Sequence, residues 1–165
     1  MKNTLHLLFV VLVIFTSCQP KTNTVPFDKV AAKEGLTKTL DTMYASFSAR
    51  DSITFMALMT EDGLFCGTSP KDFWDKATYA KLMTAMLADT SLSTKISVDK
   101  REIRFDKTGN SAFVIDQFFF AWNNKIPVRH TVHFVKNGNA WKCDFLSTAF
   151  IPKDEDMDKI YNALK

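Results

Sequence analysis

The chain has 165 residues, of which 46% are hydrophobic and 24% charged, and its 21 basic and 18 acidic residues leave a net charge of +3. This length suits one domain with a real core. The charge is too balanced to argue for nucleic acid, and there is no basic stripe. Three cysteines do not make a disulfide framework.

The first residues predict export. Lys2 supplies a positive charge, and an unbroken apolar run follows from Leu7 to Phe15. Spanning a bilayer takes about 20 apolar residues, so this run fits the core of a signal peptide rather than a membrane helix. The residues Phe15-Thr16-Ser17-Cys18 then resemble the lipobox of bacterial lipoproteins, although Leu is commoner than Phe at the first position.

These features predict a lipoprotein of the Bacteroidetes type with a signal peptide over residues 1–17 and a lipid anchor on Cys18. A polar tether over 18–27 would lead to a domain over 28–165. The expected location is the cell envelope, at the periplasmic face of the outer membrane. An ordinary secretory signal that happens to contain a cysteine is the alternative.

The first half of the domain is expected to be mainly helical. Apolar residues at helical spacing predict a first helix over about 28–49. A second short helix is expected over 53–59, with Asp51 or Ser52 as its cap. Glu61-Asp62-Gly63 is expected to end it, followed by a short strand, Leu64–Cys66, and a third helix over about 76–87.

The second half is expected to be β-rich. Four strands are predicted over 94–105, 111–122, 127–136 and 140–151, separated by turn signals. A helix after Pro152 would carry an apolar stripe at helical spacing, formed by Met157, Ile160, Tyr161 and Leu164. Helices followed by an antiparallel meander indicate the α+β class.

The turns predict which side chains share a face of the sheet. If Asn137-Gly138 is a two-residue loop, the inner face holds His130 opposite Phe145, with Ser147 beside them. A similar loop at Asn123-Asn124 would add Gln117 opposite His130, whereas a longer loop before Pro127 would invert that strand.

The same registers predict two surfaces. An aromatic strip on the outer face would form a homodimer interface, and it comprises Phe118, Phe120 and Trp122. A mostly apolar concavity with sparse polar groups would form a small-molecule pocket on the inner face. The side chains expected to line it are Tyr44, Trp74, Gln117, His130, Phe145 and Ser147.

Several segments resemble the SnoaL-like branch of the nuclear transport factor 2-like fold. They are an Asp-containing helix break at Ala49–Ile53, an acidic turn and strand at Glu61–Thr68, and an aromatic pair at Phe73-Trp74. Val128–Val132 and Asn137–Lys142 resemble the last hairpin of that family. The resemblance implies a cone of N-terminal helices packed on a curved antiparallel sheet with a short C-terminal helix.

Three functions are compatible with this resemblance, because the fold hosts isomerases, cyclases, dehydratases, ligand binders and assembly domains. We expect binding of a small, largely apolar molecule, without a cofactor. The alternatives are an isomerase, cyclase or hydratase with His130 or Asp62 as base, and a dimeric structural or interaction module. No metal is expected, because His130 and His133, three residues apart on a strand, point to opposite faces.

Overall fold

The computed structural model describes residues 27–165. The expected signal peptide, the expected lipid attachment site Cys18 and all but the last residue of the expected tether therefore lie outside the described residues. Within residues 27–165, no helix has the length and apolar character needed to cross a membrane.

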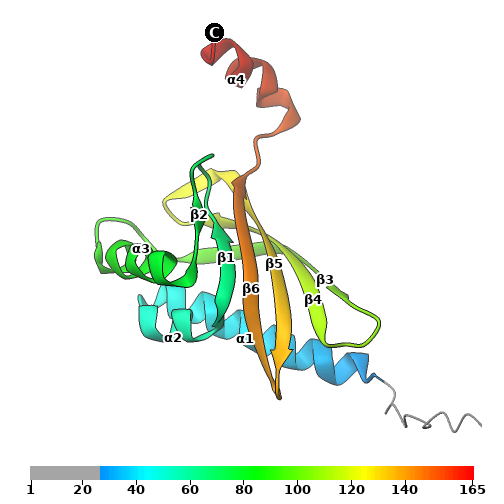
Figure 1. Cartoon of the computed structure of the whole chain (residues 1–165). Coiled ribbons are helices and arrows are strands. Elements are labelled where there is room, and N and C mark those ends of the chain that lie inside the picture. Colours follow the sequence, from blue (N-terminus) through cyan, green and yellow to red (C-terminus); the bar gives the residue numbers. More distant parts are fainter. Residues whose placement is uncertain (1–26) are drawn as a thin grey trace, which may run out of the picture.

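Three N-terminal helices pack on one face of a curved six-stranded sheet, and a C-terminal helix stands away from the body (Figure 1). This confirms the α+β class and the expected order of elements. In chain order the elements are α1 (Lys29–Ser48), α2 (Ser52–Ala57), β1 (Met59–Cys66), β2 (Phe73–Trp74), α3 (Lys76–Ala88), β3 (Ile96–Phe105), β4 (Ser111–Phe120), β5 (Asn123–Asn137), β6 (Ala140–Phe150), the 3₁₀ turn η1 (Asp154–Asp156) and α4 (Met157–Ala163).

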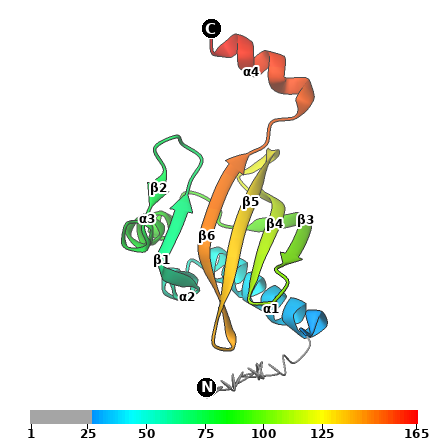
Figure 2. The ribbon, with the colours of Figure 1, turned by 45° about the vertical axis from the view of Figure 1, so that its right-hand side comes forward.

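Helix α1 crosses the inner face of the sheet and supplies much of the core (Figure 2). Its first turn is capped by Asp28, whose carboxylate accepts the N–H groups of Val30 and Ala31 at 3.0 Å. Leu36 and Leu40, one turn apart, are both fully buried. The expected cap of α2 is Asp51, which accepts the N–H of Thr54 at 2.9 Å.

The strands follow the order β2-β1-β6-β5-β4-β3. Strands β3 to β6 form the expected antiparallel meander, but β1 pairs parallel to β6. Strand β1 begins at Met59, so the prediction that Glu61-Asp62-Gly63 ends a helix is wrong. The cause is long-range pairing: the N–H of Cys143 on β6 donates to the carbonyl of Leu58 at 2.8 Å and starts the strand there.

The β5–β6 hairpin differs from the expected register in two places. Its loop is Gly138-Asn139, and Gly138 has the positive φ of 62° that the first position of a type II′ turn requires. Further along, Asp144 is an extra residue in β6, because neighbours His133 and Phe134 pair with Phe145 and Cys143. This β-bulge reverses the faces of every later residue of β6.

Strand β4 is also inverted relative to the expected register. Phe120 pairs with Asn123, so the loop between β4 and β5 is Ala121-Trp122 rather than Asn123-Asn124. Phe118 then pairs with Val128, so the register shifts by an odd number of residues, which exchanges the two faces. Asp116, rather than Gln117, consequently lies opposite His130. Asp116 and Phe118 are fully buried on the inner face, whereas Gln117 points to the outer face.

Candidate functional site: an apolar pocket between helices and sheet

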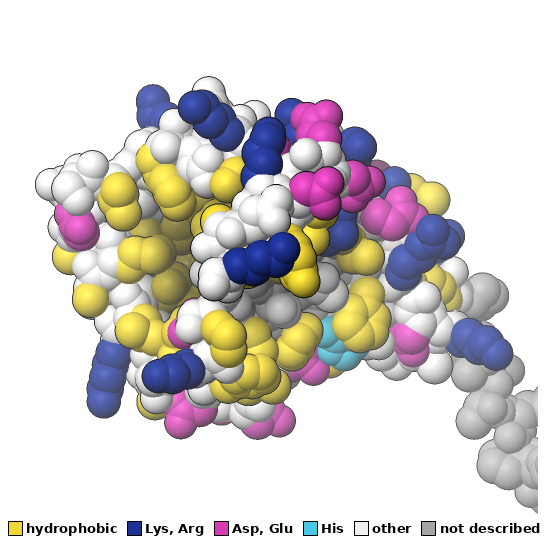
Figure 3. Space-filling view, turned by 90° about the horizontal axis from the view of Figure 1, so that it is seen from above, with side chains coloured by type: hydrophobic (Ala, Val, Ile, Leu, Met, Phe, Trp, Pro, Cys, Tyr) yellow, Lys and Arg dark blue, Asp and Glu magenta, His cyan; other side chains and the backbone are white. Residues whose placement is uncertain are grey.

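A cavity of about 360 Å³ lies between the inner face of the sheet and the helices. It opens at the end of the molecule where β6 finishes, and Figure 3 shows hydrophobic side chains gathered in a hollow on this face. Its walls are mainly aromatic rings and methionines, among them Phe47, Phe55, Met83, Phe120 and Trp122. This volume falls at the lower end of the range for small-molecule sites, about 300–1,000 Å³.

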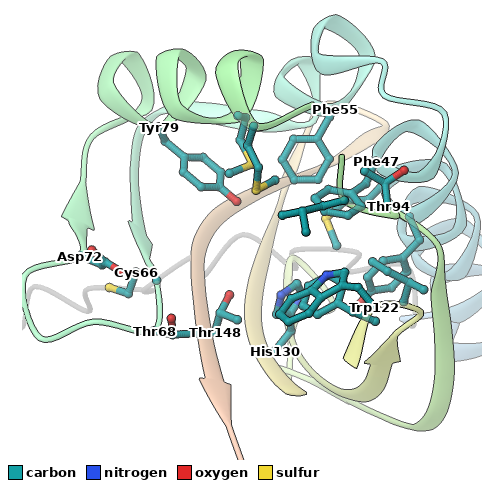
Figure 4. A pocket seen from close by; sticks show the side chains of 18 of the residues that line it. Phe47, Phe55, Cys66, Thr68, Asp72, Tyr79, Thr94, Trp122, His130 and Thr148 are labelled. Atoms are coloured by element: carbon teal, nitrogen blue, oxygen red, sulfur yellow. The ribbon is translucent and has the colours of Figure 1, made fainter. Parts of the chain in front are cut away.

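His130, as expected, lies on the inner face and lines this cavity (Figure 4). Its ring packs edge-on against Phe118, with ring centroids 4.6 Å apart, and stacks on Tyr44 at 6.2 Å. Its Nδ1 is buried and has no hydrogen-bond partner in the described part of the chain. Burial lowers the pKa of His130 to about 3, so the imidazole is neutral near pH 7.

Tyr44 lines the cavity too, but its hydroxyl is already engaged. It donates to Asp116 Oδ2 at 2.8 Å. Arg101 on β3 holds the same carboxylate through Nε and Nη2, at 2.9 Å each, and reaches Asp41 at 3.2 Å. Burial, and next the charge of Asp116, raise the pKa of Tyr44 well above its usual value. This network fastens α1 to the sheet and leaves Asp116 unavailable to a ligand.

Tyr79 and Thr148 are among the polar residues of the cavity that the sequence analysis missed. Tyr79 on α3 is buried, and its hydroxyl points into the cavity (Figure 4). The sequence pattern that could have identified Tyr79 is the helical spacing of residues 79, 83 and 86, which all line the cavity. Thr148, the strand partner of His130, takes the place expected for Ser147. The expected Trp74 does line the cavity, where it stacks on Tyr79 at 5.9 Å.

Three residues expected in the pocket lie on the opposite face of the sheet. The bulge at Asp144 turns Phe145 and Ser147 outward, where their strand partners are His133 and Thr131. The inverted register of β4 turns Gln117 outward as well, and its amide donates to Asp99 at 3.0 Å.

The prediction that Phe118, Phe120 and Trp122 form a strip on the outer face is also wrong, because the register between β4 and β5 differs from the expected one. Phe118 is fully buried in the inner layer, and Phe120 and Trp122 line the cavity. Trp122 is 48% exposed, but it lies at the cavity rather than on the outer sheet face. These three aromatic residues therefore belong to the core and the pocket.

Asp62, the other base considered, is exposed on β1 and does not line the cavity. Of the residues that do, Asp72 at the β1–β2 turn is the one carboxylate, and none is Lys or Arg. Asp72 Oδ2 accepts the N–H of Ser69 at 2.9 Å. Within residues 27–165 no group of three His, Cys, Asp or Glu side chains is placed to hold a metal ion.

The loop between α3 and β3 forms one wall of the cavity. Residues at the end of α1 and just after it hold this loop in place. Arg50 has a positive φ of 63°, and its guanidinium donates to the carbonyl oxygens of Leu87, at 2.9 Å, and Leu92. Ser48 and Thr94 exchange two hydrogen bonds between hydroxyl and carbonyl, at 3.2 and 2.9 Å. These contacts fix the loop whose residues 92–94 line the cavity.

Solved structures share this fold at low sequence identity. A nuclear transport factor 2-like protein of unknown function from Pseudomonas putida is 12% identical, with a TM-score of 0.63, over 76% of this chain and 91% of that one. An uncharacterised protein with a cystatin-like fold from Caulobacter vibrioides is 11% identical (TM-score 0.62; 82% and 99% covered). A protein from Novosphingobium aromaticivorans, provisionally named a scytalone dehydratase, is 13% identical (TM-score 0.60; 74% and 86% covered).

A search of curated proteins returned no match. The model of the SnoaL-like domain family, however, matches residues 36–145, which run from the middle of α1 to the bulge in β6. The match spans most of the described domain and both layers that enclose the cavity. The chain therefore belongs to the SnoaL-like domain family and has the nuclear transport factor 2-like fold.

Proposed function

We propose that the pocket binds a small, neutral, largely apolar molecule that hydrogen-bonds to His130. The main support for this proposal is His130, which lines the cavity and whose buried Nδ1 has no partner among the described residues. A buried polar atom without a partner costs about 1–3 kcal/mol. A ligand group that completes this hydrogen bond removes the cost and is thereby selected.

The charge of the cavity supports a neutral ligand. No lining residue is Lys or Arg, and the one lining carboxylate lies at the β1–β2 turn. An anionic group in the cavity would lose its hydration and meet no cation, which is unfavourable in an apolar site. The hydroxyl groups of Tyr79 and Thr148 could accept or donate further hydrogen bonds to a polar edge of the ligand.

Proton-transfer catalysis is the competing proposal, with an isomerase, cyclase or hydratase as the reaction class. A general base works best when its pKa lies near the operating pH. Burial instead lowers the pKa of His130 to about 3, which makes the imidazole a weak base. The neighbouring carboxylate of Asp116 is engaged by Arg101 and Tyr44, and Asp62 lies outside the cavity. These observations favour binding over catalysis.

Binding of two fluorescent probes tests this proposal. Nile red is neutral and apolar, whereas anilinonaphthalene sulfonate is similarly apolar but anionic. We expect Nile red to bind about tenfold or more tightly, which corresponds to about 1.4 kcal/mol. Thr148→Trp should abolish binding by filling the cavity. Ser147→Trp is the matched control, because its side chain points to the other face of the sheet. Equal binding to both variants would contradict the proposal.

We also propose that this domain is held in the cell envelope by a lipid on Cys18. The support is the short apolar run before a lipobox-like sequence, followed by the polar residues 19–24. A ligand taken up at a membrane face suits this placement, because apolar molecules concentrate there.

We also propose that the domain forms a homodimer, through an interface that does not use Phe118, Phe120 and Trp122. Strand pairing places Leu64, Phe145, His133 and Phe113 in one row across the outer face. Phe113 is 50% exposed, and Leu64 is 42% exposed. We expect a second copy to cover this row, because exposed apolar rows of this kind mark interfaces. Sedimentation of a Phe113→Glu variant tests it, with Ile53→Glu on α2 as the control; a dimer unaffected by Phe113→Glu would contradict it.

A further inference from the structure

The C-terminal helix α4 has little contact with the rest of the described chain. It stands off the body beyond the end of β6 (Figures 1 and 2), where Phe150, the last residue of that strand, lines the cavity. Its apolar residues fall on one stripe, at positions 157, 160, 161 and 164, and all four are exposed. Apolar stripes at this spacing normally pack against another surface. Helix α4 therefore has an apolar face without a partner among residues 27–165.

The mouth of the cavity is a second apolar surface without a cover. Leu92, Trp122 and Phe150 line the cavity, and they are 50%, 48% and 41% exposed. They come from three different segments and surround the same opening. Leaving them in water is unfavourable by about 25 cal/mol per Å² of apolar area.

The connection between these two surfaces is short. Phe150 is the last residue of β6, and Ile151 is still fixed, because its N–H donates to the carbonyl of Pro127 at 2.9 Å. The joint is thus Pro152 and Lys153, which span at most about 7 Å. A helix tethered this closely meets the mouth at a high effective concentration.

The charges of the two surfaces are complementary. Lys71 and Lys95 are sequence neighbours of residues that line the cavity, and Lys125 lies in β5, three residues after Trp122. The segment that carries α4 contributes four acidic residues in a five-residue stretch, Asp154 to Asp158. Asp154 and Asp158 take part in none of the ion pairs found among residues 27–165.

We propose that α4 is a lid that folds about Pro152 and Lys153 and closes the cavity with its apolar stripe, a proposal that rests on ligand binding in the cavity. Closure places Ile160 and Tyr161 against the exposed rings of the mouth and the acidic residues beside the lysines. The open position then admits the ligand, and the closed position shields it from water.

Disulfide trapping tests closure without any ligand. The full chain carrying Leu92→Cys and Ile160→Cys is oxidised in the cells that produce it, and the cross-linked peptides are mapped. We expect a cross-link within one chain. Leu92→Cys with Asn162→Cys is the control, because Asn162 lies on the opposite side of α4. Equal trapping of both pairs, or none, overturns the lid. Trapping between two chains overturns it in favour of α4 inserting into a second copy.

The rate of probe release tests the function of the lid. Ile160→Glu should speed the dissociation of Nile red about tenfold or more, because it removes buried apolar area and adds a charge to the closed state. Asn162→Glu should leave the rate unchanged. Identical rates in the two variants overturn the lid, whereas failure of every variant to bind Nile red contradicts the proposed function and leaves the trapping result to decide on closure.

Discussion

Replacing His130 by Phe should change how the stability of the domain depends on pH. The unfolded chain takes up a proton on His130 as the pH falls through about 6.5. The folded chain does so only near pH 3, because burial disfavours the charged imidazole. The stability contributed by neutral His130 is therefore complete above about pH 6.5 and is lost progressively as the pH falls toward 3.

The magnitude follows from the two pKa values. A pH of 4.5 lies about two units below the pKa of the histidine in the unfolded chain. Each unit lowers the free energy of unfolding by about 1.4 kcal/mol. Between pH 7.5 and 4.5 the native protein should thus lose about 2–3 kcal/mol more free energy of unfolding than His130→Phe. Phe keeps the volume and contacts apolar neighbours, so the variant should fold.

Urea unfolding at a series of pH values measures this difference directly. Comparing the two proteins cancels the contribution of the carboxylates that both contain. Parallel profiles for the native protein and His130→Phe would contradict this prediction, since they would mean that the imidazole is already solvated or paired in the folded state.

Two further predictions concern the Arg101–Asp116 ion pair beside the pocket and the proposed lipid anchor at Cys18. Arg101→Met should lower the free energy of unfolding by about 3–5 kcal/mol, because it leaves Asp116 as an uncompensated buried charge; a loss below 1 kcal/mol in urea unfolding would contradict this. Cys18→Ala should release the protein from the membrane fraction of its host, and continued membrane retention of the cleaved, unacylated variant would contradict the lipid anchor.

The helices could be predicted from the sequence because their signals are local. The stripe that includes Leu36 and Leu40, and the cap at Asp51, depend on residues a few positions apart. The start of β1 at Met59 could not be predicted in this way. It depends on pairing with Cys143, far along the chain, which overrides the turn propensity of Glu61-Asp62-Gly63.

The pocket could be predicted only in part, because the faces of its strands also depend on long-range pairing. His130 was assigned to the correct face because the true loop at Gly138-Asn139 shifts the pairing by two residues, which preserves the faces. One extra residue, Asp144, then exchanged Ser147 for Thr148 in the pocket. A bulge leaves no distinctive sequence signal, and each one reverses all the faces that follow it.

The β4 strand shows how a buried charge misleads a pattern. The register predicted from Asn123-Asn124 assigned Phe118 and Phe120 to the outer face, and the same alternation includes Asp116, whose carboxylate is typical of an exposed face. The carboxylate is nevertheless fully buried, because Arg101 on the next strand and Tyr44 on α1 satisfy it. Only the three-dimensional structure brings these partners together.

Native mass spectrometry of the protein purified from its native host tests whether the cavity holds a small, neutral, largely apolar molecule. We expect a retained mass that is present in the native protein and in Ser147→Trp but absent from Thr148→Trp. The retained molecule, once released, should be uncharged at neutral pH and carry a hydrogen-bonding group. A protein that carries no ligand, or an anionic ligand that persists in Thr148→Trp, would contradict ligand binding in this cavity.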